Sequence, residues 1–233
     1  MTLFQEPFTL PSECRDFVEW HRGRSPYLFW AVDLDTPVVR QRIDLAAMQL
    51  DGLLLDAYRR QPHVTLDVCG FPSGEPRYPD DFGPELLNAQ CLAMRAAHLA
   101  CFEIEVGGLA SFSSAPYLAL ADHGGGLAAV RKCLAVAGTN RLTGAFTPHL
   151  TVGLYADAWP AAMVHSRLAR FAVGESLRCR VERISLMSYA PSEIGGPLSR
   201  VGSFHLESGR MRWHDAANQL IPDFQSALRR FAR

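Results

Sequence analysis

Two five-residue stretches, Pro62-His63-Val64-Thr65-Leu66 and Pro148-His149-Leu150-Thr151-Val152, decide the interpretation of this chain. Both read Pro-His-apolar-Thr-apolar. With eight His and eight Thr among 233 residues, chance supplies only about 0.3 cases of a Thr two places after a His, and here two cases also share their flanking residues. The histidines are 86 residues apart (149 − 63), a spacing that suits one lobe of an internal duplication.

Alternation along a strand gives each stretch two different faces. Side chains two residues apart point the same way, so His63 and Thr65 share one face, as do His149 and Thr151. Their apolar neighbours point into the core. Each stretch therefore offers one proton-transfer group and one hydroxyl on a single face of a strand.

The remaining sequence predicts an α+β order of elements from apolar periodicity and from Pro and Gly boundaries. We expect strands at 27–32, 63–69, 102–106, 117–120, 148–155, 178–188 and 203–206, and helices at 37–50, 84–99, 127–137, 160–171 and 224–231. The strand at 102–106 is expected to stop at Gly107-Gly108. Each half then contains one His strand followed by a helix.

The length suits one large domain or two intimately joined lobes. We expect residues 25–207 to form a two-lobed domain, residues 1–24 an N-terminal extension with one short helix, and residues 208–233 a C-terminal extension. Apolar residues make up 48% and charged residues 20% of the chain, which is the balance of a globular protein with a sizeable core.

Composition also narrows the partners and the location. No apolar run reaches the length of a membrane span, and the N-terminus lacks the pattern of a secretory signal, so no membrane partner is expected. Six scattered cysteines without a Cys-x-x-Cys pair favour reduced thiols and a cytoplasmic protein. The net charge of −1 gives no overall basic field for nucleic acid. We expect a monomer.

Two imidazoles and two hydroxyls in one cleft suit phosphodiester cleavage. In-line displacement at phosphorus needs a base on the entering oxygen and an acid on the leaving oxygen. His63 and His149 supply both, because the reference pKa of histidine, about 6.5, allows one neutral and one protonated ring near neutral pH. Thr65 and Thr151 can donate to the non-bridging oxygens, where charge develops. This chemistry needs no metal and no cofactor.

Other interpretations stay open at the level of sequence. A single His or Thr in a strand is commonly a packing or surface residue. A metal-dependent hydrolase is disfavoured, because no two histidines have i, i+4 spacing and no Cys-x-x-Cys is present. A non-catalytic nucleotide- or RNA-binding module would keep the cleft without the chemistry. Asp67, two residues past Thr65, is expected on the same face in a structural or peripheral role.

The sequence resembles the two-histidine (2H) phosphoesterase superfamily, in particular its bacterial branch of RNA 2′,3′-cyclic phosphodiesterases, also called 2′-5′ RNA ligases. The two Pro-His-apolar-Thr-apolar stretches carry this resemblance as paired HxTx motifs. Supporting segments are 28–32, 102–109 and 184–188. The similarity spans about residues 25–207.

The resemblance implies a bilobal fold in which two pseudo-symmetric antiparallel sheets, with helices on the outside, border a central cleft. It implies metal-independent hydrolysis of a cyclic or 2′-5′ phosphodiester, with a small cyclic nucleotide or an RNA end with a terminal cyclic phosphate as substrate, and RNA ligase-like activity. By the same resemblance His63 donates a proton to the leaving oxygen, His149 activates water, and Thr65 and Thr151 bind the phosphate. A two-histidine site can also run in the opposite direction.

The chain departs from the family after the second stretch. RNA-directed members often carry arginines there, whereas this sequence continues Gly153-Leu154-Tyr155-Ala156-Asp157, which favours a small cyclic phosphate or a short nucleotide over a long RNA. Further candidates by position are three aromatics for base stacking, for which core roles are favoured, and two arginines for phosphate contacts: Tyr27, Phe29, Tyr189, Arg183 and Arg200.

Overall fold

The computed structural model describes residues 4–136, 145–172, 174–220 and 224. The strands are β1 (Tyr27–Asp33), β2 (His63–Pro72), β3 (Asp81–Phe82), β4 (Phe102–Ser111), β5 (Pro116–Ala121), β6 (His149–Thr151), β7 (Leu177–Val181), β8 (Arg183–Tyr189), β9 (Ser199–His205) and β10 (Arg210–Trp213). The helices are α1 (Val18–His21), α2 (Pro37–Gln49), α3 (Pro84–Ala96), α4 (Gly126–Leu134), α5 (Ala161–Ala169) and the 3-10 helix η2 (Asp215–Gln219).

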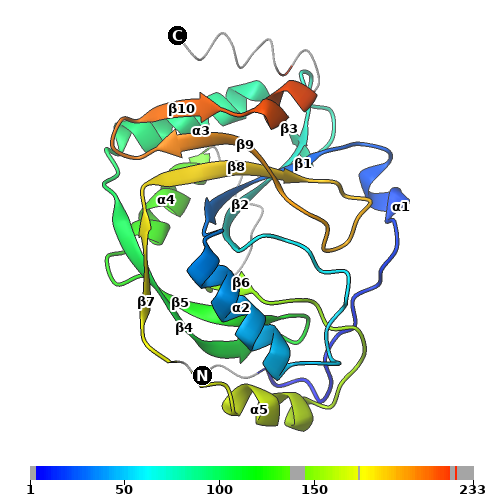
Figure 1. Ribbon diagram of the computed structural model, residues 1–233. Helices are drawn as coiled ribbons and strands as arrows, with labels where there is room; N and C mark the ends of the chain where they lie inside the picture. The colour runs from blue at the N-terminus through cyan, green and yellow to red at the C-terminus, as the bar shows by residue number, and fades with distance from the viewer. Residues whose placement is uncertain (1–3, 137–144, 173, 221–223, 225–233) are drawn as a thin grey trace.

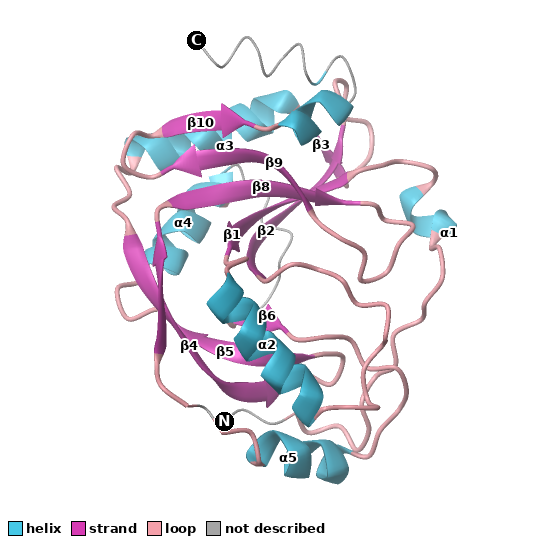
Figure 2. Cartoon of the chain, in the orientation of Figure 1, coloured by secondary structure: helices cyan, strands magenta, loops and turns pink. Residues whose placement is uncertain are grey.

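The strands form two sheets with helices around them (Figure 1). The larger sheet has the order β10-β9-β8-β1-β2-β3, and the smaller sheet has the order β6-β5-β4-β7. All neighbours are antiparallel except β2 and β3, which are parallel. Helix α4 packs against β2, α5 against β4, and α3 against α4 (Figure 2). The predicted α+β fold with two sheets is therefore confirmed.

The start of α2 shows how the sequence sets an element boundary. Thr36 precedes the helix, and its Oγ1 accepts a hydrogen bond from the Val39 backbone N–H at 3.4 Å. Pro37 occupies the first helical turn, where a missing N–H removes no intrahelical bond. The helix begins where Asp35-Thr36-Pro37 predicts it.

One hydrophobic core joins both sheets. Trp30 of β1, Leu66 of β2, Ile104 of β4 and Leu150 of β6 belong to the same buried cluster. Trp30 is fully buried, and its Nε1 donates to Gln90 Oε1 at 2.8 Å. Because strand residues alternate, the positions between these core residues lie on the other face of each sheet.

That other face of the larger sheet carries the first predicted histidine. Cross-strand pairing sets Asp33 opposite His63 and Ala31 opposite Thr65, so these four residues lie on one side. We call this side the His63 face.

The two His strands lie side by side although they belong to different sheets. The short strand β3 pairs with β2 only at Phe71 and Pro72, far from its His63 end. β6 is the edge strand of the smaller sheet and contacts β2 directly (Figure 1). The internal repeat therefore brings its two copies to one seam between the sheets.

The prediction of a single strand at 178–188 is wrong. The segment forms two strands, β7 and β8, which belong to different sheets and are separated at Glu182. The apolar alternation changes phase at this point, since Val181 is buried in β7 whereas Ile184 and Leu186 are buried in β8. A phase change of one residue turns the side chains to the other face, and the chain uses it to pass between sheets.

The prediction that a strand ends at Gly107-Gly108 is also wrong, because β4 runs through both glycines. Pairing with β5 shifts register between Val106 and Leu109, so the glycines lie in a bulge. A Cβ on Gly107 would lie 3.2 Å from the Ala119 carbonyl oxygen, a close approach that glycine permits.

Three other boundaries differ from the sequence prediction. β2 continues past residue 69 to Pro72, and β6 covers only three residues. β10 and η2 lie in the segment predicted as a C-terminal extension. The helix predicted at 224–231 falls outside the described residues except for Phe224, which is buried.

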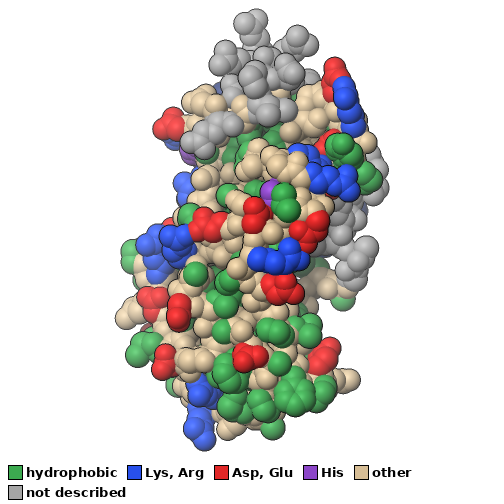
Figure 3. Space-filling model, turned by 90° about the vertical axis from the view of Figure 1, so that its right-hand side faces the viewer, with side chains coloured by type: hydrophobic (Ala, Val, Ile, Leu, Met, Phe, Trp, Pro, Cys, Tyr) green, Lys and Arg blue, Asp and Glu red, His purple; other side chains and the backbone are tan. Residues whose placement is uncertain are grey.

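The N-terminal segment contacts both halves of the molecule. The Thr9 N–H donates to the Trp159 carbonyl at 2.9 Å, beside the smaller sheet. Arg24 pairs with Asp80 Oδ1 at 2.8 Å, next to β3 of the larger sheet. The side of the molecule that carries α1 mixes hydrophobic, acidic and basic side chains (Figure 3). Among the described residues no helix combines the length and the hydropathy that crossing a membrane requires.

Candidate active site

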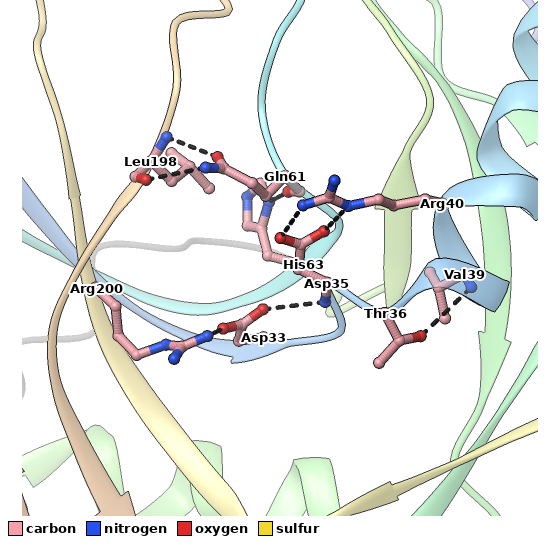
Figure 4. Close-up of polar contacts among 9 residues, drawn as sticks. All are labelled: Asp33, Asp35, Thr36, Val39, Arg40, Gln61, His63, Leu198 and Arg200. Carbon is pink, nitrogen blue, oxygen red and sulfur yellow. Dashed lines mark hydrogen bonds and ion pairs between the residues drawn. The ribbon is translucent and has the colours of Figure 1, made fainter.

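His63 begins β2 and is 9% exposed. Its Nδ1 lies 2.7 Å from the Gln61 carbonyl oxygen (Figure 4). Because a carbonyl oxygen can only accept, Nδ1 carries the proton of the neutral ring. Nε2 is therefore the nitrogen with the lone pair.

The side chain of Gln61 fixes the segment that orients His63. Gln61 Nε2 donates to the Leu198 carbonyl at 3.1 Å, and the Leu198 N–H donates to Gln61 Oε1 at 2.7 Å (Figure 4). This two-way bond joins the chain before β2 to the chain before β9. The carbonyl that holds the imidazole is thus anchored to a neighbouring part of the sheet.

His149 begins β6 and repeats the arrangement of His63. Its Nδ1 lies 2.8 Å from the Thr147 carbonyl oxygen, again two residues earlier, so the lone pair again lies on Nε2. Its ring meets Phe112 edge-on with the centroids 5.0 Å apart. The ring of His63 similarly lies 5.5 Å from Phe29. Both predicted histidines therefore have the same tautomer and an aromatic neighbour.

Burial keeps both imidazoles neutral. The pKa of His63 is lowered to about 4, mainly by desolvation and also by the nearby charges of Arg60 and His149, while the Gln61 hydrogen bond and Asp33 act in the opposite direction. Desolvation also lowers the pKa of His149, against the hydrogen bond to Thr147. The charge of His149 affects the pKa of His63 because β2 and β6, the strands that carry them, are in contact.

The two predicted threonines lie on the same side as their histidines. Thr65 pairs with Ala31 on the His63 face, and Thr151 pairs with Tyr117 in the smaller sheet. Both side chains are half-buried. The hydroxyl of Tyr58 hydrogen-bonds to Thr151, which adds a second hydroxyl beside it.

The expectation that Asp67 shares the face of His63 is wrong. The register between β1 and β2 shifts at Trp30/Ala31, and Asp67 pairs with Trp30. This bulge turns Asp67 to the core side, where Gln90 Nε2 donates to its Oδ2 at 3.1 Å. Its structural role is as expected.

Sequence reasoning missed Arg60, whose charge acts on His63. Its guanidinium carbon is 4.4 Å from the centroid of the Tyr189 ring, and its Nε is buried without a hydrogen-bond partner. Within the described part of the chain no carboxylate pairs with it. Arg60 also lines a cavity of about 530 Å³ together with Tyr58, Gln61 and Val152. A cation without a counter-ion therefore faces a hollow next to the site.

The other candidates fall into two groups. Tyr27 and Phe29 are 8% and 3% exposed and serve as core residues, whereas Tyr189 is half-buried. Arg200 reaches across the His63 face to form an ion pair with Asp33 (Figure 4). Nothing in the described ranges groups three or more His, Cys, Asp or Glu side chains as a metal site.

The comparison with protein families identifies the chain. The model of the 2′-5′ RNA ligase superfamily matches residues 37–193, which is more than half of the chain. The protein therefore belongs to this superfamily of two-histidine phosphoesterases, as the paired motifs predicted. Among proteins with curated descriptions, none matches the sequence significantly.

Solved structures share the fold. Escherichia coli LigT complexed with 3′-AMP matches with a TM-score of 0.53 and 19% identity, over 78% of this chain and 98% of LigT. TT0787 of Thermus thermophilus matches with a TM-score of 0.49 and 20% identity, over 78% of this chain and 98% of that one. The likeness to LigT places the two-sheet architecture within a known fold.

The lowered pKa of His63 predicts an acid-dependent loss of stability that a substitution removes. In the unfolded chain this histidine gains a proton below about pH 6.5, whereas in the folded protein it stays neutral down to about pH 4. The free energy of unfolding therefore falls as the pH is lowered through that window. His63→Asn keeps a donor for the Gln61 carbonyl and does not titrate. Wild type should lose about 3 kcal/mol more than the variant in this window, measured by urea unfolding at a series of pH values.

The matched control is His123→Asn, because the His123 side chain is 80% exposed. Its unfolding free energy should follow that of wild type at every pH. Parallel curves for wild type and His63→Asn would show that His63 is not desolvated in the folded protein.

Proposed function

We propose that this protein hydrolyses a cyclic or 2′-5′ phosphodiester, such as a 2′,3′-cyclic nucleotide or an RNA terminus, without metal or cofactor, through His63 and His149. The observation that carries this proposal is the matched pair of imidazoles at the seam of the two sheets, each with Nδ1 bound to a carbonyl two residues earlier. Such a pair supplies two Nε2 atoms for proton transfer. The 3′-AMP held by LigT supports a nucleotide as the ligand.

In the proposed reaction the two rings act on opposite oxygens of one phosphorus. His149 Nε2 takes a proton from water, and the resulting nucleophile attacks phosphorus. The bond to the leaving oxygen breaks, and protonated His63 Nε2 donates its proton to that oxygen. The rings exchange protonation states, and proton exchange with water restores them. The family resemblance supplies the assignment of acid and base.

The acid must gain its proton together with the substrate. In the free protein both pKa values lie below the ordinary value, and the charge of Arg60 opposes protonation of His63. A bound phosphodiester anion offsets that charge and favours the protonated imidazole. Binding and protonation are therefore coupled.

In this proposal three groups hold the phosphate. The hydroxyls of Thr65 and Thr151 lie next to their histidines in the strands and can donate to non-bridging oxygens. Arg60 adds a positive charge that no carboxylate of the described residues neutralises. Its planar fork suits phosphate, and it stands in for the arginines that relatives carry after the second motif.

Replacing either histidine should abolish turnover without unfolding the protein. We expect His63→Ala and His149→Ala each to lower kcat for a 2′,3′-cyclic nucleotide by about 10²-fold or more, because each removes one proton-transfer group. Products are resolved chromatographically, with circular dichroism as the folding control. Wild-type activity should persist in chelator. Tight nucleotide binding without turnover would instead identify a binding module, and loss in chelator restored by zinc would refute the mechanism.

The pH dependence should differ between the free protein and its complex. Since both histidine pKa values are lowered, the bell-shaped profile of kcat/KM should be centred below about pH 6.5. The profile of kcat should be displaced to higher pH, because the bound anion raises the pKa of the acid. Steady-state kinetics across pH would measure both profiles. Two coincident profiles would contradict coupled protonation.

The charge of Arg60 should matter more than its shape. Arg60→Gln should lower kcat/KM by about 10- to 100-fold, whereas Arg60→Lys retains the charge and should recover part of the loss. The control is Arg59→Gln, since the neighbouring Arg59 forms an ion pair with Glu193. Equal losses in the Lys and Gln variants would exclude a role for the charge.

A further inference from the structure

The His63 face continues past β1 over three more strands, and it is basic there. Two rows of residues run across β8, β9 and β10 in register, the first being Arg183, His205 and Arg210, and the second Ser185, Ser203 and Arg212. Their neighbours Ile184 and Phe204 belong to the buried core. Strand alternation therefore sets both rows on the side of the sheet that carries His63.

The arginines of these rows lack carboxylate partners. Arg183, Arg210 and Arg212 are exposed, and among the described residues none of them forms an ion pair. Arg183 lies on β8, and Arg210 and Arg212 lie on β10, the two strands on either side of β9. In a chain with a net charge of −1, this grouping is a local feature.

The interior side of the basic rows also has unsatisfied polar atoms. Arg200 pairs with Asp33, yet its Nε is buried without a hydrogen-bond partner, and so is the Oγ of Ser185. Burial lowers the pKa of His214, and the charges of Arg200, Arg212 and Arg183 lower it further. Positive charge therefore collects around these atoms.

A hollow adjoins the rows near His63. A cavity of about 330 Å³ is lined by Asp33, Thr36, Arg178 and Arg183, among others, between the end of β1 and strands β7 and β8. It links the neighbourhood of the Asp33–Arg200 pair to the exposed arginines. The lining also contains Arg180 and Glu182, which pair with each other, so its unpaired cations among the described residues are Arg178 and Arg183.

We propose that the basic face of β8, β9 and β10, built around Arg183, Arg210 and Arg212, binds the backbone phosphates of a single-stranded RNA whose reacting phosphodiester lies at His63 and His149. This inference rests on the proposed function and deepens it. Adjacent strands are about 4.8 Å apart, so β2 and β10 are separated by about 19 Å, enough for several nucleotides.

The arrangement favours a nucleic-acid backbone. Arginine forks recognise phosphate oxygens in two-point contacts, and their row continues from the place where a phosphate is proposed to react. Arg210 and Arg212 lie beyond residues 37–193, which the family model matches. This face places cations on the larger sheet, whereas residues 153–157, directly after the second motif, include no arginine or lysine. An oligonucleotide then gains phosphate contacts on this face that a mononucleotide cannot make.

The test compares two substrates in the full-length protein. The double variant Arg183→Gln/Arg212→Gln is assayed with adenosine 2′,3′-cyclic monophosphate and with an octanucleotide RNA that ends in a 2′,3′-cyclic phosphate. We expect kcat/KM for the octanucleotide to fall about 10-fold or more, while kcat/KM for the mononucleotide stays within about twofold. Arg77→Gln is the control, since Arg77 is exposed on the loop before β3 and pairs with Glu75.

The salt dependence supplies a second readout. Each lost phosphate contact should make the slope of log(kcat/KM) against log salt shallower by about 0.7 for the octanucleotide. Equal losses on both substrates, or an octanucleotide rate equal to that of wild type, would overturn the proposal. Circular dichroism of the double variant confirms folding.

A binding assay separates failure of this proposal from failure of the proposed function. Fluorescence anisotropy with a labelled octanucleotide ending in a 3′-phosphate requires no chemistry. Arg77→Gln should bind this probe within about threefold of wild type, and the double arginine variant should bind it about 10-fold more weakly. If the double variant binds as tightly as wild type, the basic face is refuted even where cyclic nucleotides are hydrolysed. If the double variant binds the probe more weakly while the wild-type protein turns over no substrate, the result supports RNA binding by the basic face and refutes the catalytic proposal.

Discussion

Each histidine donates its Nδ1–H to the carbonyl oxygen of the residue two positions earlier, and the site depends on this bond. It selects one tautomer and directs the ring, because a carbonyl can only accept. It also leaves the pKa to be governed by burial. A carboxylate in the same place would stabilise the imidazolium through its charge, whereas a neutral carbonyl opposes desolvation only in part. The result is a pair of neutral rings in which both Nε2 lone pairs are available to accept a proton.

The bulge between β1 and β2 keeps two kinds of polar residue apart. Up to this point the strand sets His63 and Thr65 on one face, and beyond it Asp67 turns to the core. There Asp67 is part of a buried network with Gln90 and Trp30. Without the extra residue the carboxylate would lie on the His63 face, where its charge would raise the pKa of the imidazole. This irregular pairing therefore keeps the charge of Asp67 off the face that carries His63.

The sequence predicted most of what depends on local pattern. Alternation in the two motifs and the helix start at Thr36 follow from periodicity and capping, whereas the two-sheet fold class was implied by the family resemblance. The structure confirms them. The sequence did not predict Gln61 or Arg60 as neighbours of the site, because their roles come from contacts with Leu198 and Tyr189, more than a hundred residues away. The break at Glu182 had a readable signal in the phase change of the apolar residues, whereas the bulge that turns Asp67 had none.

Charge ties these observations together. Arg60 is a partly buried cation whose Nε has no partner among the described residues, and its charge acts on His63, whose pKa burial lowers. Such a group is costly unless an anion compensates it. In the proposed function a phosphodiester supplies the missing charge, relieves the repulsion between Arg60 and a protonated His63, and offers oxygens to the threonine hydroxyls. The same features that are costly in the free protein are therefore complementary to a phosphodiester anion, which is the form of selectivity that a preorganised site provides.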